Sequence, residues 1–143
     1  MAKKLSNLSK QAKDKLMTKW SEFLEKGKFV HEDHKGCWIW DGGQTGGLNY
    51  KNEDRYPAVW VWESKESGGG FTCRGNIVAY FLAYSQVPTY GKTCVSHLCH
   101  ESLCINPDHL ELETLLCNSN RQLCREKGKC SEDHEKKCFP HRR

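Results

Sequence analysis

Apolar residues near the N-terminus recur at steps of three and four, with lysines and glutamates between them. They are Leu5, Leu8, Ala12, Leu16, Trp20 and Phe23. This spacing predicts an amphipathic helix from Ser6 to about Lys26, and Gly27 supplies a natural stop. We interpret it as a helix that packs on the rest of the domain. A helix that flanks DNA or forms a dimer is the alternative.

Alternating apolar and polar residues in the middle of the chain predict a β-ribbon. Residues 55–63 are rich in β-branched and aromatic side chains, and residues 71–74 form a returning strand after a turn at 64–70. The preceding segment, 44–54, is polar and rich in glycine, which predicts a loop. The ribbon either covers the core or presents side chains to a DNA major groove, which is wide enough for two strands.

A hydrophobic segment over residues 77–84 predicts the main core helix, with Asn76 as its N-cap. Farther along, residues 92–98 and 109–112 predict two short strands on either side of a turn. A helix over 115–123 then follows. The predicted order is therefore strand, turn, strand, helix.

The turn between these strands contains cysteines and a histidine at intervals typical of metal ligands. Cys99, Cys104 and His109 are separated by four residues each, and thiolates with imidazole suit tetrahedral zinc. A fourth ligand must come from elsewhere. Cys37, which precedes a short aromatic strand, is the candidate, and a buried free cysteine is the alternative interpretation.

A second ligand set lies in the C-terminal tail. Cys124, Cys130, His134 and Cys138 form a complete Cys3His group, and the residues between them are too polar to build a core. A structural zinc would replace that missing core.

Composition narrows the class of protein. The chain has 143 residues, enough for one domain, and its net charge of +4 permits a nucleic-acid partner without identifying one. The cysteines number nine, and a disulfide framework is the alternative to metal sites. No long apolar run or signal-like N-terminus is present in this sequence, so we expect a soluble protein, nuclear or cytoplasmic, with no membrane partner and reduced cysteines.

These motifs together resemble the His-Cys box of homing endonucleases, within the ββα-metal (His-Me finger, HNH-like) nucleases. The resemblance is specific over residues 92–138. It rests on His97-Leu98-Cys99-His100, Cys104, Asn106-Pro107, His109-Leu110, Asn118 and the four tail ligands. It implies an α+β fold, a single nuclease domain over 1–143, double-stranded DNA as partner and a possible homodimer. Within that domain we expect an N-terminal helix (1–27), a DNA-facing sheet with the core helix (36–91), the catalytic motif (92–123) and a zinc-binding tail (124–143).

The resemblance also implies roles for individual residues. It places one structural zinc on Cys37, Cys99, Cys104 and His109, and a second on Cys124, Cys130, His134 and Cys138. It makes His97 the general base, Asn118 a ligand of a catalytic Mg2+ or other divalent ion, and an arginine a contact to the scissile phosphate. Arg55 best fits that arginine, with Arg74 in reserve.

Two other functions compete with a metal-dependent DNA endonuclease. One is a non-catalytic zinc module that binds DNA or protein, in which His97 merely borders a zinc turn. The other is a hydrolase acting through an open zinc, which two complete four-ligand sets disfavour. A binding module needs neither His97 nor Asn118, so their joint presence favours the enzyme.

Overall fold

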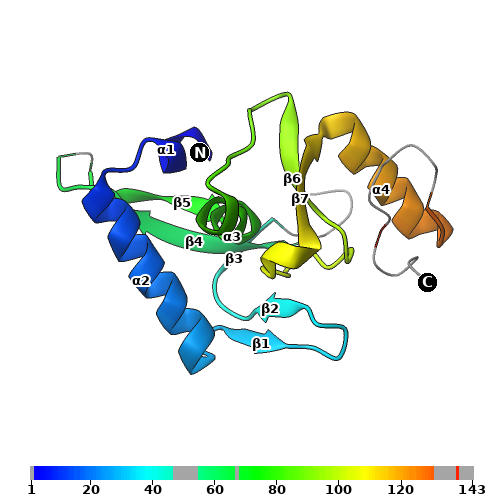
Figure 1. The fold of residues 1–143 in the computed structure, drawn as a ribbon, viewed down its shortest axis with the longest axis horizontal. Helices are drawn as coiled ribbons and strands as arrows, with labels where there is room; N and C mark the ends of the chain where they lie inside the picture. Colours follow the sequence, from blue (N-terminus) through cyan, green and yellow to red (C-terminus); the bar gives the residue numbers. More distant parts are fainter. Residues whose placement is uncertain (1, 47–54, 67, 131–137, 139–143) are drawn as a thin grey trace.

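The computed structural model describes residues 2–46, 55–66, 68–130 and 138. The fold mixes helices with antiparallel strands, as predicted, and Figure 1 shows their arrangement. In chain order the elements are α1 (Ala2–Ser6), α2 (Lys10–Lys26), β1 (Val30–Glu32), β2 (Trp38–Trp40), β3 (Gln44–Gly46), β4 (Arg55–Trp62), β5 (Gly70–Arg74), α3 (Gly75–Tyr84), β6 (Thr93–His97), the 3-10 helix η1 (Pro107–His109), β7 (Leu110–Thr114) and α4 (Leu115–Lys127).

The N-terminal helix is interrupted, so the prediction of one helix from Ser6 was wrong at its start. Ser9 is the N-cap of α2, and its side-chain oxygen accepts a hydrogen bond from the Ala12 amide. A serine that satisfies a free amide in this way begins a new helix. The predicted stop is confirmed, because Gly27 ends α2 in a left-handed conformation with φ 63°.

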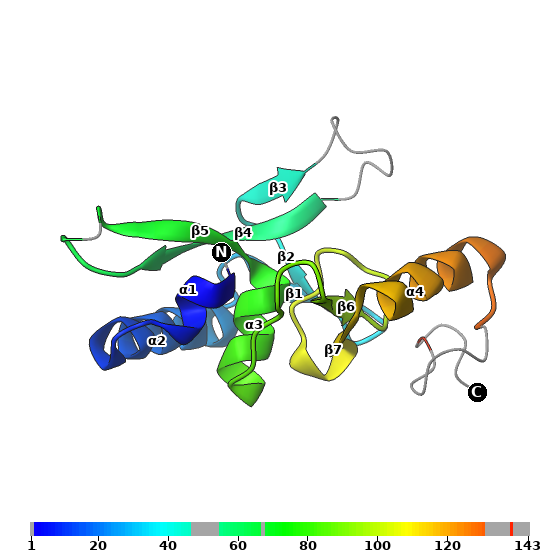
Figure 2. The same ribbon diagram turned by 90° about the horizontal axis from the view of Figure 1, so that it is seen from above.

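The central sheet has the order β3-β4-β5, with antiparallel pairing throughout. In Figure 2, α1, α2 and α3 lie on one side of this sheet. Val59 and Val61 face these helices and are buried, whereas Trp60 on the opposite face is 51% exposed. The strand therefore alternates between a core face and an open outer face.

Two short strands were missed by the sequence analysis. The segment predicted as a loop over 44–54 begins with β3, which pairs with the first residues of β4, and residues 47–54 lie outside the described part of the chain. β1 pairs with β2, joining Val30 to Trp40. Neither strand has an apolar alternation of its own. Backbone pairing with a neighbouring strand creates both, and single-sequence patterns do not contain that information.

Helix α3 is the centre of the core and contacts β4, β5, β6, β7 and η1. The prediction of Asn76 as its N-cap was wrong, because Arg74 is the N-cap and Asn76 lies inside the first turn. The Asn76 side chain is buried and donates to the Val95 carbonyl over 3.1 Å. Its amide group thus ties the helix to β6 instead of capping the helix.

The predicted order of strand, turn, strand and helix is confirmed. β6 and β7 pair antiparallel from Thr93↔Thr114 to His97↔Leu110. Thr114 caps α4 by accepting from the Cys117 amide. None of the helices in the described ranges combines the length and apolar character that crossing a membrane requires.

Candidate metal centres and active-site cavity

Four predicted zinc ligands from three parts of the chain meet in one cluster, which we call cluster 1. The ligand atoms of Cys37, Cys99, Cys104 and His109 all lie within 4.8 Å of one another. His109 Nδ1 is 3.6 Å from the Sγ atoms of both Cys37 and Cys104. A tetrahedral zinc with its usual bond lengths would separate sulfur from nitrogen by about 3.6 Å. The cluster therefore has the geometry of a zinc site.

Backbone pairing brings Cys37 to the other three ligands. Strand β2 bonds along the loop after β6, with the Trp40 amide donating to the Leu103 carbonyl and the Ile105 amide donating to the Trp38 carbonyl. The Asn106 side chain donates to the Gly36 carbonyl over 2.9 Å. These hydrogen bonds hold Cys37, the residue before β2, against the turn that carries the other three ligands.

The electrostatics of cluster 1 call for a cation. Burial, together with the neighbouring Cys104, raises the pKa of Cys37 to about 12. A hydrogen bond with Cys104, followed by burial, also raises the pKa of Cys99. The same hydrogen bond lowers the pKa of Cys104 to about 6. Thiolates packed this closely would repel one another. A divalent ion that replaces their protons would offset this repulsion with its own positive charge.

A second group, cluster 2, joins α4 to the C-terminal tail. The Sγ atoms of Cys124, Cys130 and Cys138 lie within 4.8 Å of one another, so this group could also hold zinc. The predicted fourth ligand, His134, lies outside the described residues. None of the nine cysteines forms a disulfide in this structure. Six of them lie in the two clusters, which favours metal sites over a disulfide framework.

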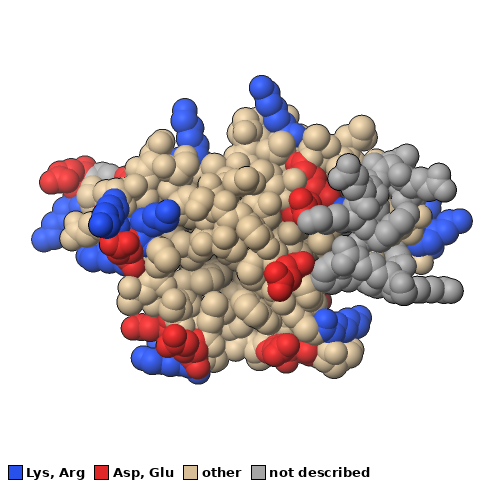
Figure 3. Space-filling model, in the orientation of Figure 1, with Lys and Arg blue, Asp and Glu red and all other residues tan. Residues whose placement is uncertain are grey.

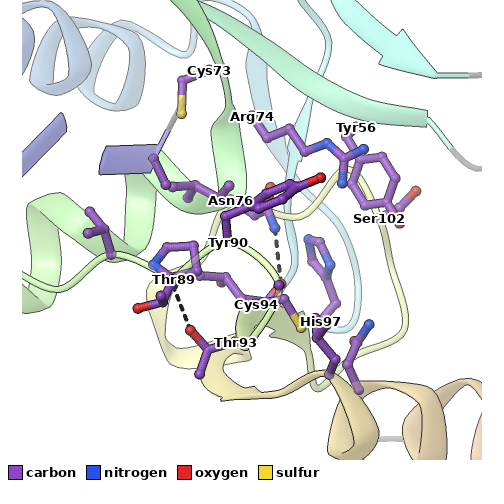
Figure 4. Close-up of a pocket in the computed structure, with 18 of the residues that line it drawn as sticks. Tyr56, Cys73, Arg74, Asn76, Thr89, Tyr90, Thr93, Cys94, His97 and Ser102 are labelled. Atoms are coloured by element: carbon purple, nitrogen blue, oxygen red, sulfur yellow. Dashed lines mark hydrogen bonds between the residues drawn. The ribbon is translucent and has the colours of Figure 1, made fainter. Parts of the chain in front are cut away.

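His97 and Asn118 line the same cavity, which has a volume of about 1120 Å3. Its walls come from β4, β5, α3, the segment before β6, β6 itself and α4. Figure 4 shows Arg74 and Tyr56 near His97. The tertiary fold therefore brings together, as the resemblance implied, the predicted base and the predicted ligand of a divalent ion.

The His97 imidazole has a defined orientation. Its Nε2 lies 3.2 Å from the carbonyl oxygen of Cys104. A carbonyl oxygen only accepts hydrogen bonds, so this contact requires the ring proton on Nε2 and leaves the basic lone pair on Nδ1. On its other side the ring lies 6.2 Å from the Tyr56 ring, measured between centroids.

Asn118 lies in the first turn of α4 and is half-buried. Its Oδ1 accepts a hydrogen bond of 2.9 Å from the hydroxyl of Ser96, the neighbour of His97 on β6. Sequence reasoning missed Ser96 and Tyr56. A serine inside a strand carries no motif, and only the packing of α4 against β6 reveals its contact.

The two arginine candidates lie on different faces of the central sheet. Arg74 lines the cavity, and its guanidinium carbon is 4.3 Å from the centroid of the Tyr56 ring. Arg55 is exposed at the start of β4, does not line the cavity, and has the parity of the buried positions Pro57 and Val59. The role of Arg55 at a phosphate stays a prediction. Because Arg74 lines the cavity and Arg55 does not, Arg74 is the better candidate for the phosphate contact.

His100 and the surface charges complete the description of the site. His100 lines the cavity in a left-handed conformation with φ 63°. Lys3 and Arg125 also line the cavity and add positive charge. On the face drawn in Figure 3, the basic side chains of the described residues lie in separate places with acidic ones between them.

A comparison with known protein families gives a match for the C-terminal part of the chain. Residues 74–142 match the family model described as the zinc-binding loop region of homing endonuclease. This match supports a relationship to the His-Cys box homing endonuclease family. Searches of curated proteins and of solved structures returned no significant match.

The His-Cys box segment contains His97, Asn118, Arg74 and the described ligands of both clusters except Cys37. Cys37 precedes the matched segment by a long stretch of chain, yet its sulfur lies among the ligand atoms of the box. The antiparallel strands, the helices and the Cys/His clusters are consistent with a zinc-stabilised ββα-metal nuclease fold. The protein thus contains a nuclease-related zinc module.

Proposed function

We propose that this protein is a divalent-metal-dependent DNA endonuclease that hydrolyses phosphodiester bonds at a specific site. One observation carries the proposal: His97, Asn118 and Arg74 line a single cavity within the His-Cys box segment. A general base, a hard oxygen ligand and a cationic group are the parts that hydrolysis of a phosphodiester requires.

His97 acts as the general base. With the proton held on Nε2 by the Cys104 carbonyl, Nδ1 accepts the proton of a water molecule that attacks the phosphorus. The hydrogen bond also keeps the ring from rotating, so the lone pair keeps one direction. Cluster 1 supports this geometry because Cys104 is both a predicted zinc ligand and the partner of the imidazole.

Asn118 supplies an amide oxygen to the catalytic cation, and the donor type fits Mg2+, which prefers oxygen ligands and keeps several waters. When bound, such an ion stabilises the negative charge that develops on the phosphate and on the leaving oxygen. One protein ligand suffices because DNA and water supply the remaining oxygens. The half-buried position of Asn118 beside the cavity leaves room for them.

Arg74 contacts the scissile phosphate. It projects from the open face of the sheet, and the Tyr56 ring fixes its guanidinium by a cation-π contact. Lys3 and Arg125 lie farther along the same cavity and attract the DNA backbone. Both zinc ions are structural in this proposal, because a complete set of four protein ligands leaves no open position for a substrate.

The test is cleavage of supercoiled plasmid and of a library of long random DNA sites by zinc-loaded protein, with and without Mg2+. His97→Ala and Asn118→Ala should each lower the rate by about a hundredfold or more while zinc content is unchanged. His31→Ala, on exposed β1, and Asn120→Ala, on α4, are the matched controls.

The products separate the remaining possibilities. Discrete fragments indicate a site-specific enzyme, linear DNA indicates a homodimer that cuts both strands, and nicked circles indicate a monomer. Failure of folded, zinc-loaded protein to cut any DNA in the library would contradict the proposal. A non-catalytic zinc-stabilised module that binds DNA or protein would then replace it.

A further inference from the structure

Ser96 is a buried polar residue that the proposed chemistry does not use. It is 1% exposed and lies on β6 between Val95 and His97. Its hydroxyl donates to Asn118 Oδ1 over 2.9 Å. A buried hydroxyl needs a partner, and here the partner is the amide oxygen assigned to the catalytic cation.

This hydrogen bond can fix the amide without blocking the cation. The Asn118 amide can rotate about its last side-chain bond, so an unrestrained side chain presents oxygen and nitrogen in turn. An amide oxygen has two lone pairs. The Ser96 hydroxyl occupies one of them, and the other remains for a cation.

Ser96 lies beside a buried ion pair between Glu113 and Arg121. The Arg121 Nε atom donates to both Glu113 carboxylate oxygens, at 2.9 and 2.7 Å, and both side chains are almost fully buried. The Glu113 carboxylate lies close to the Ser96 hydroxyl, whose single proton is donated to Asn118. Arg121 Nη1 donates in turn to the Cys138 sulfur of cluster 2 over 3.5 Å. The hydroxyl therefore has rigid surroundings that reach from the strand to the tail.

We propose that Ser96 is a positioning residue that holds the Asn118 oxygen towards the cation, on a support formed by Glu113 and Arg121. This inference rests on the proposed function for its catalytic consequence. Its structural part, the fixed Asn118 amide, stands independently of catalysis.

The experiment measures DNA cleavage against Mg2+ concentration for the full chain and for Ser96→Ala. We expect the Mg2+ concentration at half-maximal rate to rise about three- to tenfold, the effect of losing one neutral hydrogen bond. Zinc content and thermal midpoint should stay close to those of the unchanged protein. Ser96→Thr, which restores a hydroxyl, should recover most of the affinity.

Cys94→Ala is the matched control. Cys94 lies two residues away on the same face of β6 and lines the cavity, and its sulfur contacts the Ser96 hydroxyl at 3.9 Å. A merely structural role would shift maximal rate and stability in both variants. An unchanged Mg2+ midpoint in Ser96→Ala, or an equal shift in Cys94→Ala, would overturn the inference.

A second measurement follows the side-chain amide signals of Asn118 by nuclear magnetic resonance, assigned with Asn118→Ala. A fixed amide gives two proton signals displaced from those of a solvent-exposed asparagine, with slow solvent exchange, and Ser96→Ala should move both signals towards the solvent-exposed values and speed their exchange. Signals of a freely averaging amide in the unchanged protein would overturn the inference even if Ser96→Ala did not fold. If the unchanged protein cut no DNA, the endonuclease proposal would fail, and this spectrum would still decide whether Ser96 fixes Asn118.

Discussion

The imidazole of His97 and the backbone carbonyl of Cys104 are joined by a hydrogen bond of 3.2 Å. Cys104 is also a member of cluster 1. The orientation of the proposed base therefore depends on the loop that the four ligands fold. A substitution in cluster 1 should therefore change the orientation of the His97 imidazole even when no cavity residue is replaced.

Replacement of a cluster 1 ligand tests this dependence. Cys37→Ser removes the ligand that lies outside the His-Cys box segment, and we expect bound zinc to fall from two ions to one. Loss of a structural zinc should lower the thermal midpoint and abolish cleavage, because the metal would join the segment before β2 to the turn that orients His97. Elemental analysis and circular dichroism measure the two effects.

Cys117→Ser is the control for Cys37→Ser, since Cys117 belongs to neither cluster. It should retain both zinc ions. Full zinc content in Cys37→Ser would show that Cys37 is a buried free cysteine, which was the alternative interpretation of its sequence context.

The two arginines can be distinguished by direct comparison. Arg74→Ala should lower the cleavage rate by about a hundredfold, the usual effect of removing a group that stabilises transition-state charge. Arg55→Ala, on the other face of the sheet, should change it only slightly. Single-turnover rates at saturating DNA separate the chemical step from binding. The reverse ranking of the two variants would restore Arg55 as the phosphate contact.

The buried Glu113 predicts acid sensitivity. Burial opposes ionisation of Glu113, but the hydrogen bonds from Arg121 and the charge of its guanidinium outweigh it and lower the pKa of the carboxyl. A lowered pKa in the folded state means that the unfolded state takes up the proton first as pH falls. The stabilisation is thus fully present above the unfolded pKa and is lost as pH falls through the folded one.

Urea unfolding at several pH values measures this contribution. Glu113→Gln should be less stable than the unchanged protein at neutral pH, because Arg121 keeps a buried charge without its full partner. The difference should begin to shrink as pH falls below about 4.3, the usual pKa of a glutamate in an unfolded chain, and should continue to shrink until the carboxyl is also protonated in the folded state. A difference that is constant with pH would show that the ion pair does not contribute in this way.

Gly75, the first residue of α3, allows the helix to approach the central sheet closely because it has no side chain. A Cβ atom at this position would lie 2.4 Å from the Cβ of Pro57, which is fully buried. Gly75→Ala should therefore force β4 and α3 apart and destabilise the protein by about 1–3 kcal/mol. Thermal unfolding measures the effect. Ala83→Gly, at an exposed site in the same helix, should cost only about 1 kcal/mol from helix propensity.

Sequence patterns predicted much of this fold because the signals are local. The alternation over 55–63 predicted β4, and Gly27 was recognised as the end of α2 because helix termination involves only neighbouring residues. The break at Ser9 and the strand β3 were missed. A continuous apolar stripe conceals a cap, and a polar strand exists only through its partner.

The sequence by itself determined the ligand types, their spacing and the match of residues 74–142 to the zinc-binding loop region of homing endonuclease. Residue chemistry and short-range spacing are properties of the chain. Only the tertiary structure decided that Cys37 joins cluster 1, that Arg74 and not Arg55 lines the cavity, and that Ser96 contacts Asn118. Each of these depends on which face of a strand or helix meets a distant segment, and packing of the whole core sets that choice.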